Sequence, residues 1–318
     1  METTVKNKII IGTRSSKLAL WQAEWIKSKL QKLNPNLEIE LNKIKTTGDK
    51  ILDVPLAKVG GKGLFVKEIE EAMLRNEADL AVHSMKDVPT DFPENLHLAV
   101  ITKREDPRDA FITPSGSNKS AVKSFKDLPN GAKVGTSSLR RACQLLSIRP
   151  DLKIEQLRGN LDTRLKKLDE GLFDAIILAA AGVNRLGWAD RITELLEPEI
   201  SLPAIGQGAV GIECRIDDKF INDLIQQLDH KETSICVRAE RACLKKLEGG
   251  CQVPIAAYAR LTDGKISING LVGSVSGERI IRASYSGSLD NPESLGIALA
   301  EDLLSKGAKE ILAEVYAK

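Results

Sequence analysis

The sequence predicts an α/β protein with two similar doubly wound domains and a small α+β C-terminal domain with a three-stranded antiparallel sheet. Three observations support this prediction. Short apolar runs alternate with amphipathic helical patterns over residues 8–213, as they do in parallel βαβ units. One strand, turn and helix pattern occurs twice in that region. Alternating strands separated by turn residues follow near the C-terminus.

Composition limits the class of protein. A chain of 318 residues suggests two or three domains, at roughly 100–200 residues each. The net charge of only +2 argues against a general nucleic-acid binder. A polar N-terminus and the lack of an apolar run of about 18 residues predict a cytoplasmic protein with no membrane segment. Five cysteines and three separated histidines show no ligand spacing, so we expect reduced thiols and no metal.

The first predicted domain begins with a buried strand over Lys8–Ile11 and a long amphipathic helix over Lys17–Leu33. Serines precede this helix, where they can cap its N-terminus, and such an end favours an anion. Strands are predicted at Leu37–Lys45 and Asp79–His83, with a helix over Leu64–Asn76 between them.

The second predicted domain repeats this beginning. Lys133–Arg141 reproduces the strand, the Gly-Thr pair, the paired serines and the helix start of the first domain. Strands follow at Lys153–Leu157 and Asp174–Leu178, and the strand Ala209–Glu213 is expected to return to the first domain. We therefore expect two similar α/β domains with anion-binding loops.

The third predicted domain follows a helix over Thr233–Leu247. Its alternating strands and its final helix are expected at Ile255–Leu261, Lys265–Val272, Arg279–Tyr285 and Pro292–Tyr316. The predicted boundaries are 1–104 with 204–226, then 105–203, and then 227–318.

Arginines gather in or just after the strand-to-helix turns, where ligands of parallel sheets bind. Several guanidinium groups at one cleft would suit a ligand with many carboxylates or phosphates. For any single arginine, a surface cap or ion pair is an equally good interpretation. The residues concerned are Arg14, Arg140, Arg141, Arg158, Arg164 and Arg185.

Two further residues, a cysteine and an aspartate, could take part in a reaction directly. Cys251 follows two glycines and precedes Pro254, so its thiol is expected on an open loop, although an ordinary exposed thiol fits that pattern too. The other four cysteines fit packing positions. Asp87 directly follows a buried strand, where a carboxylate could stabilise a cation or relay a proton, or else cap a turn.

Seven motifs occur in an order that closely resembles the hydroxymethylbilane synthase, or porphobilinogen deaminase, family. The resemblance extends from about residue 8 into the C-terminal region. It implies that the first two domains resemble type II periplasmic-binding-protein domains. The motifs are Gly12–Ala19, Gly60–Phe65, His83–Pro89, Gly135–Arg141, Leu157–Asn160, Leu202–Glu213 and Glu248–Pro254.

The resemblance implies a monomeric transferase of tetrapyrrole and haem biosynthesis. Such an enzyme joins four porphobilinogen molecules head to tail into hydroxymethylbilane and releases ammonia at each condensation. The chain grows on a dipyrromethane cofactor, which a thioether would link to Cys251. Each pyrrole carries carboxylates, and the resemblance implies that the arginines bind them. Loss of ammonia from porphobilinogen leaves a cation, which a fixed carboxylate would stabilise.

The resemblance also assigns roles to individual residues. Asp87 is the expected catalytic carboxylate, and Lys58–Gly63 is a candidate mobile lid. The expected cofactor-binding residues are Cys251, Lys86, Asp87, Arg140, Arg141, Arg158, Ser138 and Thr136. The expected substrate-binding residues are Arg14, Ser16, Lys62, Arg158, Arg164 and Arg185.

Two other functions also fit parts of the pattern. Two α/β domains with anion-binding turns describe solute-binding proteins and ligand domains of regulators, which need no reactive thiol and no third domain to carry one. Phosphoryl transfer on Gly60–Gly63 is disfavoured, because that segment lacks the Gly-x-x-x-x-Gly-Lys-Ser/Thr spacing.

Overall fold

The computed structural model describes residues 6–50, 63–116, 121–249 and 253–316. These residues form two compact units. The first holds residues 6–50, 63–104 and 209–234, and the second holds the remaining described residues. The second unit contains two separate sheets. The predicted three-domain boundaries stay a prediction.

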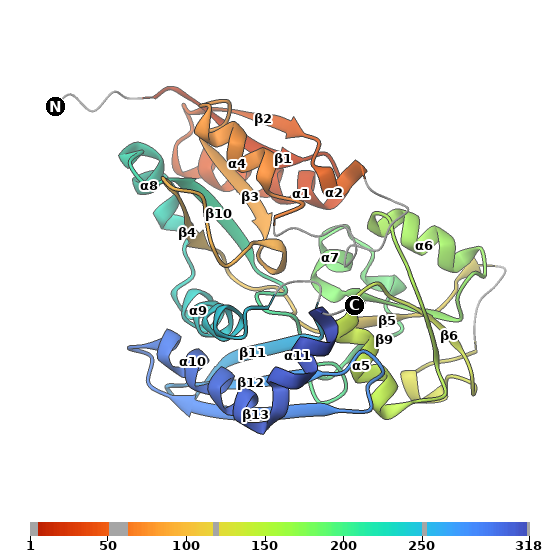
Figure 1. Cartoon of the computed structure of the whole chain (residues 1–318). Helices are drawn as coiled ribbons and strands as arrows, with labels where there is room; N and C mark the ends of the chain where they lie inside the picture. Colours follow the sequence, from red (N-terminus) through yellow and green to blue (C-terminus); the bar gives the residue numbers. More distant parts are fainter. Residues whose placement is uncertain (1–5, 51–62, 117–120, 250–252, 317–318) are drawn as a thin grey trace. The chain divides into compact units, whose positions relative to one another are not determined.

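A five-stranded mixed sheet forms the centre of the first unit (Figure 1). The second strand of the order is parallel to both of its neighbours, whereas the fourth is antiparallel to its neighbours. That antiparallel strand is the segment predicted to return from late in the sequence, and this prediction is confirmed. The strands in spatial order are β2 (Glu38–Ile44), β1 (Lys8–Arg14), β3 (Leu80–Ser84), β10 (Val210–Arg215) and β4 (Leu96–Ile101).

Helices pack on both faces of this sheet. Helix α1 (Lys17–Leu33), whose bounds agree with the prediction, packs Ile26 and its other buried residues against one face. Helix α4 (Lys67–Leu74) packs against Ala81 on the other face, because successive strand side chains alternate. The other helical segments are α2 (Thr47–Lys50), η1 (Met85–Asp87), α8 (Lys219–Ile225), η5 (Gln226–Leu228) and α9 (Lys231–Lys246), which continues into the second unit.

The first sheet of the second unit repeats this topology. Its second strand is parallel to both neighbours, and its fourth is antiparallel to both. The predicted internal repeat is therefore confirmed. In spatial order the strands are β7 (Lys153–Glu155), β6 (Lys133–Gly135), β8 (Ala175–Ala179), β5 (Asp109–Ile112) and β9 (Glu194–Leu196). The helical segments are α5 (Leu139–Ile148), α6 (Leu161–Asp169), α7 (Ala180–Arg185), η3 (Phe125–Asp127) and η4 (Ala189–Arg191).

The second sheet of this unit is the predicted three-stranded antiparallel meander, formed by β11 (Ile255–Thr262), β12 (Lys265–Gly273) and β13 (Ile280–Gly287). The prediction of one continuous helix after it is wrong. Gly307 has a φ of 101°, which other residues rarely adopt, and it interrupts the helix. The segments are α10 (Pro292–Leu303), a π-type turn (Leu304–Ala308) and α11 (Lys309–Tyr316).

Candidate functional site

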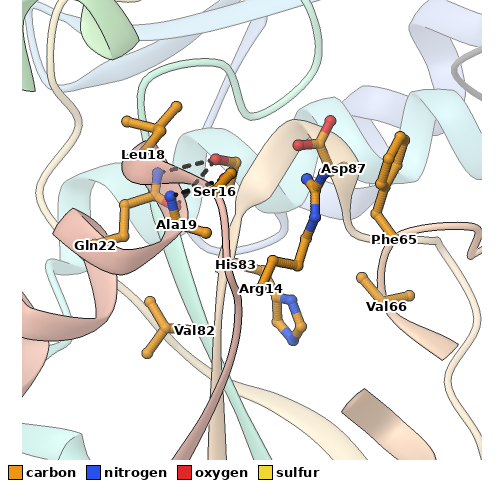
Figure 2. A pocket seen from close by; sticks show the side chains of 11 residues that line it. Arg14, Ser16, Leu18, Ala19, Gln22, Phe65, Val66, Val82, His83 and Asp87 are labelled. Atoms are coloured by element: carbon orange, nitrogen blue, oxygen red, sulfur yellow. Dashed lines mark hydrogen bonds between the residues drawn. The ribbon is translucent and has the colours of Figure 1, made fainter. Parts of the chain in front are cut away.

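A pocket opens in the first unit where two parallel strands end. Strand β1 ends at Arg14, and β3 leads into the 3₁₀ turn that contains Asp87. Because these strands run in the same direction, motifs far apart in sequence meet at one sheet edge. Figure 2 shows the pocket, which is lined by Arg14, Ser16, Leu18, Ala19, Gln22, Phe65, Val66, Val82, His83, Ser84 and Asp87.

The N-terminus of α1 forms one wall of this pocket. Ser16 caps the helix, since its Oγ accepts a hydrogen bond from the backbone N–H of Ala19 at 3.3 Å. Gln22, one turn further along, donates through Nε2 to Ser84 Oγ at 2.9 Å. The predicted cap is confirmed, and it places the N-terminal turn of α1, an end that favours an anion, beside the pocket.

Arg14 is held on two sides. Its guanidinium forms an ion pair with Asp49, and it lies 4.3 Å from the centroid of the Phe65 ring. Burial opposes ionisation of Asp49, but the hydrogen bond and the charge of Arg14 outweigh it and lower the pKa of that carboxyl. The side chain of Arg14 keeps 21% of its surface exposed. It is therefore orientated by Asp49 yet still accessible at the pocket.

Asp87 has a different environment. Its carboxylate lines the pocket, half-buried, at the end of the short turn that the Val88 N–H closes onto the Met85 carbonyl at 3.2 Å. Among the described residues it forms no hydrogen bond and no ion pair. An ionised carboxylate without a protein partner can accept hydrogen bonds from a ligand, and it would stabilise a positive charge there.

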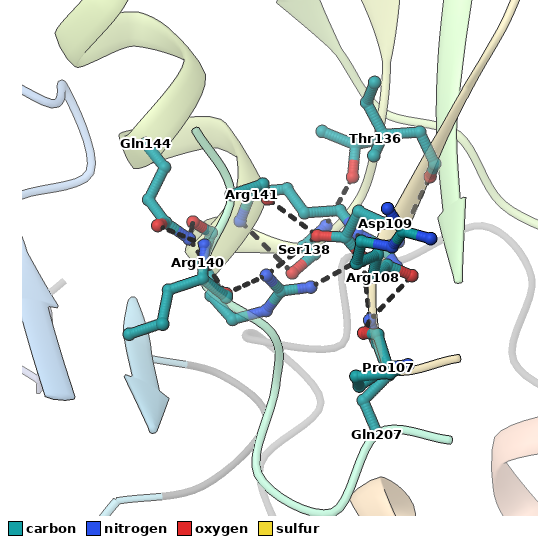
Figure 3. Close-up of polar contacts among 12 residues, drawn as sticks. Pro107, Arg108, Asp109, Thr136, Ser138, Arg140, Arg141, Gln144 and Gln207 are labelled. Carbon is teal, nitrogen blue, oxygen red and sulfur yellow. Dashed lines mark hydrogen bonds and ion pairs between the residues drawn. The ribbon is translucent and has the colours of Figure 1, made fainter. Parts of the chain in front are cut away.

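The repeated turn of the second unit leads to a buried charge cluster (Figure 3). Arg140 and Arg141 are 5% and 6% exposed, and both contact the fully buried carboxylate of Asp109. Their Nη atoms lie 2.9 and 2.7 Å from its oxygens. Ser201 Oγ and Gln207 Nε2 donate to the same carboxylate at 2.7 and 2.9 Å.

This cluster fixes the charge state of Asp109. Burial would raise the pKa of the carboxyl, but the charges of Arg140 and Arg141 and their hydrogen bonds hold it well below its usual range. Two guanidinium groups against one carboxylate leave one positive charge in excess. The sequence pattern did not reveal that Asp109 would be the partner of both arginines.

The remaining predicted residues of the second unit lie near the carboxyl ends of its parallel strands. Thr136 Oγ1 accepts from the Ser138 N–H at 3.2 Å, and Ser138 Oγ caps α5. Arg158 follows β7, and Arg164 Nε donates to the Gly159 carbonyl at 2.8 Å. Arg185 ends α7 and donates to the Gly208 carbonyl at 2.6 Å. Burial lowers the pKa of Arg185 despite the opposing charge of Glu105.

Some predicted residues lie outside the part of the chain that the structure describes. These are Cys251, Lys62 and most of the candidate lid Lys58–Gly63. The packing positions predicted for the other cysteines are confirmed, since all four are buried. Burial raises the pKa of the Cys143, Cys214 and Cys243 thiols to about 12, which makes them poor nucleophiles.

Several residues at these sites were not predicted from the sequence. Gln22, Phe65 and Ser84 line the pocket. Phe65 and Ser84 belong to quoted motifs but had no role assigned, and Gln22 lies three residues after the first motif. Asp109 and Gln207 complete the second cluster. Within the described ranges, no helix has the length and apolarity required to span a membrane, and no three His, Cys, Asp or Glu side chains are placed to hold a metal ion.

Comparisons with known proteins agree on one family. The family model "Porphobilinogen deaminase, dipyromethane cofactor binding domain" matches residues 9–223, and "Porphobilinogen deaminase, C-terminal domain" matches residues 234–305. The porphobilinogen deaminase of Geobacter sulfurreducens is 59% identical over 310 residues, which cover 98% of this chain and 95% of that protein. That of Geobacter metallireducens is 60% identical over 306 residues, covering 96% and 94%.

Solved structures give a more distant similarity. The methionine-binding protein MetQ is 16% identical, with a TM-score of 0.45 over 70% of this chain and 90% of that chain. The BvgS VFT2 domain of Bordetella pertussis is 16% identical, with a TM-score of 0.41 over 70% and 86%. These similarities are too distant to bear on function.

Proposed function

The chain belongs to the porphobilinogen deaminase family, and from this premise we propose which of its residues carry the reaction. Membership makes it an enzyme that condenses porphobilinogen into hydroxymethylbilane on a dipyrromethane cofactor. One observation carries the proposal. The pocket of the first unit gathers Arg14, Ser16 and Asp87 from two separate motifs at one sheet edge.

Asp87 is the proposed catalytic carboxylate. It lines the pocket without a partner among the described residues, so it is available to pyrrole N–H groups. When the amine of porphobilinogen leaves as ammonia, the ring that remains is a cation. A fixed carboxylate that need not reorganise lowers the energy of that cation, as preorganised groups do in a site shielded from bulk water.

The described residues fit a ligand rich in carboxylates. Arg14 and Ser16 present a guanidinium, a hydroxyl and the N-terminus of α1 to the pocket, and the Asp109 cluster keeps one excess positive charge. For the cofactor we propose Lys86, Asp87, Thr136, Ser138, Arg140, Arg141 and Arg158. For substrate carboxylates we propose Arg14, Ser16, Lys62, Arg158, Arg164 and Arg185.

Cys251 is the proposed attachment point of the cofactor. A thioether there would provide a fixed end to which units are added, so that the growing chain is not released between condensations. The described cysteines support this choice by elimination, because all four are buried. We further propose that the enzyme acts as a cytoplasmic monomer with the three domains predicted above, and that Lys58–Gly63 acts as a lid.

The intact mass of the purified chain tests the attachment. We expect an excess mass equal to two porphobilinogen units less their lost ammonia, and we expect it to be absent from Cys251→Ser. A buried thiol provides the matched control, so Cys236→Ser should keep the excess mass. A Cys251→Ser protein that carries the full adduct would move the attachment point to another residue.

The role of Asp87 is tested by turnover. Asp87→Asn should keep the cofactor mass and the fold but lower porphobilinogen consumption by roughly 100-fold or more, as loss of a key electrostatic group does. The control is Asp91→Asn, four residues further along and exposed, which should behave as wild type. Wild-type turnover by Asp87→Asn would remove this carboxylate from the reaction.

A further inference from the structure

Three titratable side chains form a buried cluster in the first unit. Glu213 on β10 is fully buried, Glu70 on α4 is 7% exposed, and His83 on β3 is 5% exposed. None of the roles proposed above uses them. Buried ionisable groups are costly to retain unless they are paired, so a cluster of three requires an explanation.

Strand register brings two of them together. Strand β10 is antiparallel to β3, with Glu213 opposite Ala81 and Gly211 opposite His83, so Glu213 and His83 are diagonal neighbours on one face. His83 Nε2 lies 3.1 Å from Glu213 Oε2. This distance allows an ion pair, but the angle does not make a hydrogen bond. Helix α4 covers the same face and brings Glu70 to it.

The two carboxyl groups of the cluster affect each other. Both oxygens of Glu213 and one of Glu70 lack hydrogen-bond partners among the described residues. Burial is the largest cause that raises the pKa of the Glu70 carboxyl, to about 7, and the negative charge of Glu213 is the second. The charge of His83 opposes this rise. Glu71, on the same helix, adds to the rise.

Few other charges face this cluster from the neighbouring elements. Strand β4 places the apolar Leu98 opposite Glu213. The charged groups on the pocket side are Arg14 at the end of β1 and Asp87 after β3. The cluster therefore holds two carboxyl groups and one imidazole, and the Glu70 carboxyl, whose pKa is raised to about 7, changes its protonation near neutral pH.

His83 connects the cluster to the pocket. Its side chain lines the pocket together with Arg14 and Asp87. Figure 2 shows the His83 ring below Arg14. A group that contacts the pocket on one side and Glu213 on the other can pass a proton inward.

The condensation releases such a proton. The protonated aminomethyl group of porphobilinogen first leaves as neutral ammonia, and the electron pair of the broken carbon–nitrogen bond goes with the nitrogen. The cation that remains then forms the new carbon–carbon bond with a free ring carbon of the growing chain. The ring carbon that was attacked then loses its hydrogen as a proton, and the electron pair of that C–H bond restores the aromatic ring. No oxidant or reductant is involved, but a base must accept the proton.

We propose that His83 accepts this proton at the pocket, and that Glu213 and Glu70 position its ring and take up the charge behind it. The proposal rests on the proposed function of the pocket. It assigns Asp87 the stabilisation of the cation and His83 the removal of the proton. Glu70 and Glu213 act through His83 and are positioning residues.

The first test is a titration of the histidine rings by NMR in the enzyme as purified. The chain has three histidines, so His97→Gln and His230→Gln leave few signals to assign. We expect the His83 signals to show, besides any inflection of the ring itself, a second one near pH 7 that reports Glu70. A His83 ring that senses no second group would overturn the proposal, and this result needs no variant of the cluster.

The second test compares Glu70→Gln with Glu71→Gln, its exposed neighbour on the same helix. In the wild type and in Glu71→Gln, porphobilinogen consumption should rise with pH through about 7 as Glu70 ionises. In Glu70→Gln this rise and the matching NMR inflection should both disappear. Identical pH profiles for all three proteins would contradict the proposal.

The third test is His83→Gln. We expect it to load the cofactor to the wild-type mass but to turn over roughly 100-fold more slowly or worse, as loss of a general base does. Wild-type turnover would overturn the role of His83. A wild-type enzyme without porphobilinogen turnover would instead contradict the proposed function, while the ring titration would still decide whether the cluster shares protons.

Discussion

Each unit buries a carboxylate on the same strand of its repeated topology, but at a different position along that strand and in different surroundings. In each unit the single antiparallel strand beside the parallel ones carries a fully buried acid, Asp109 on β5 and Glu213 on β10. Asp109 receives two guanidinium groups, a hydroxyl and an amide. Glu213 faces one imidazole and has a second carboxyl group, that of Glu70, near it.

This difference separates a fixed charge from a titratable one. Asp109 is satisfied by its donors at every ordinary pH, so its cluster is a permanent cation of constant geometry. Glu213 accepts no hydrogen bond from any described residue, and the Glu70 carboxyl near it changes its protonation near neutral pH. The repeated topology thus supports two kinds of site: one suited to holding an anionic ligand, the other to moving protons.

The largest expected effect comes from the fixed cluster. Asp109→Asn removes the carboxylate that pairs with both Arg140 and Arg141 and leaves two buried cations side by side. We expect a loss of about 3–5 kcal/mol in the free energy of unfolding, as for other broken buried ion pairs. Urea unfolding measures it. Glu197→Gln, which breaks the exposed pair with Arg108, is the control and should change little.

A stable Asp109→Asn protein would show that the arginines are not held by that charge. In that case the comparison between the units would lose its first half, because Asp109 would not be a fixed charge that the fold requires.

In the titratable cluster, replacing an acid is expected to raise the free energy of unfolding, whereas Asp109→Asn is expected to lower it. The folded-state pKa of Glu70 is raised from 4.5 to about 7, so the folded protein binds more protons than the unfolded chain between these values. Stability should therefore fall as pH rises from about 4.5 through 7. Glu70→Gln avoids this loss and should be more stable than wild type at pH 8, by up to about 3 kcal/mol.

Thermal unfolding at two pH values measures this effect. The advantage of Glu70→Gln should be present at pH 8 and nearly absent near pH 4.5, where the carboxyl is protonated in the folded state and only half ionised in the unfolded state. Glu71→Gln, which is exposed, should show no such dependence. Equal melting temperatures of Glu70→Gln and wild type at pH 8 would mean that Glu70 carries no raised pKa.

The sequence predicted where the site residues lie better than what they contact. Arg14, Asp87 and Arg140 were placed correctly at strand-to-helix turns, because turn glycines, capping serines and apolar runs are local signals. The partners Asp49 and Asp109 were not found. Asp109 lies in a charged stretch that resembles an exposed loop, and only the pairing of β5 with β8 and β9 buries it.

Two of the three missed strands have the same cause. Strands β5 and β9 are four and three residues long, too short for a pattern of alternation to be visible. The break at Gly307 was missed because a single glycine within a helical pattern is often tolerated. His83 was part of a quoted motif, but its link to Glu213 depends on the register between β3 and β10, which are more than a hundred residues apart in sequence.

The repeated turns allow a finer comparison. Ser16 and Ser138 cap α1 and α5 with similar geometry, since their Oγ atoms accept from the N–H of Ala19 at 3.3 Å and Arg141 at 3.4 Å. Ser16→Ala and Ser138→Ala should each cost about 1 kcal/mol. Urea unfolding of both variants, with Ser28→Ala within α1 as the control, measures this. Clearly unequal losses would show that the two turns are not equivalent.

The smallest expected effect concerns the Arg14–Asp49 pair, the more exposed counterpart of the Asp109 cluster. Both side chains keep about a fifth of their surface exposed, at 21% and 20%, so solvent screens their attraction. Asp49→Asn should cost about 1 kcal/mol or less at pH 7. Because Arg14 lowers the pKa of Asp49 below its ordinary value of 3.8, the contribution is present above that pH and is lost as pH falls further.

Urea unfolding at pH 7 and pH 3 therefore distinguishes the two arginine sites. The difference between Asp49→Asn and wild type should shrink at pH 3, whereas the larger loss in Asp109→Asn should persist, because the pKa of Asp109 is held much lower. A loss in Asp49→Asn as large as that in Asp109→Asn would contradict the assignment of Arg14 as accessible. It would mean that this guanidinium, like those of Arg140 and Arg141, is bound primarily by its own unit rather than presented to a ligand.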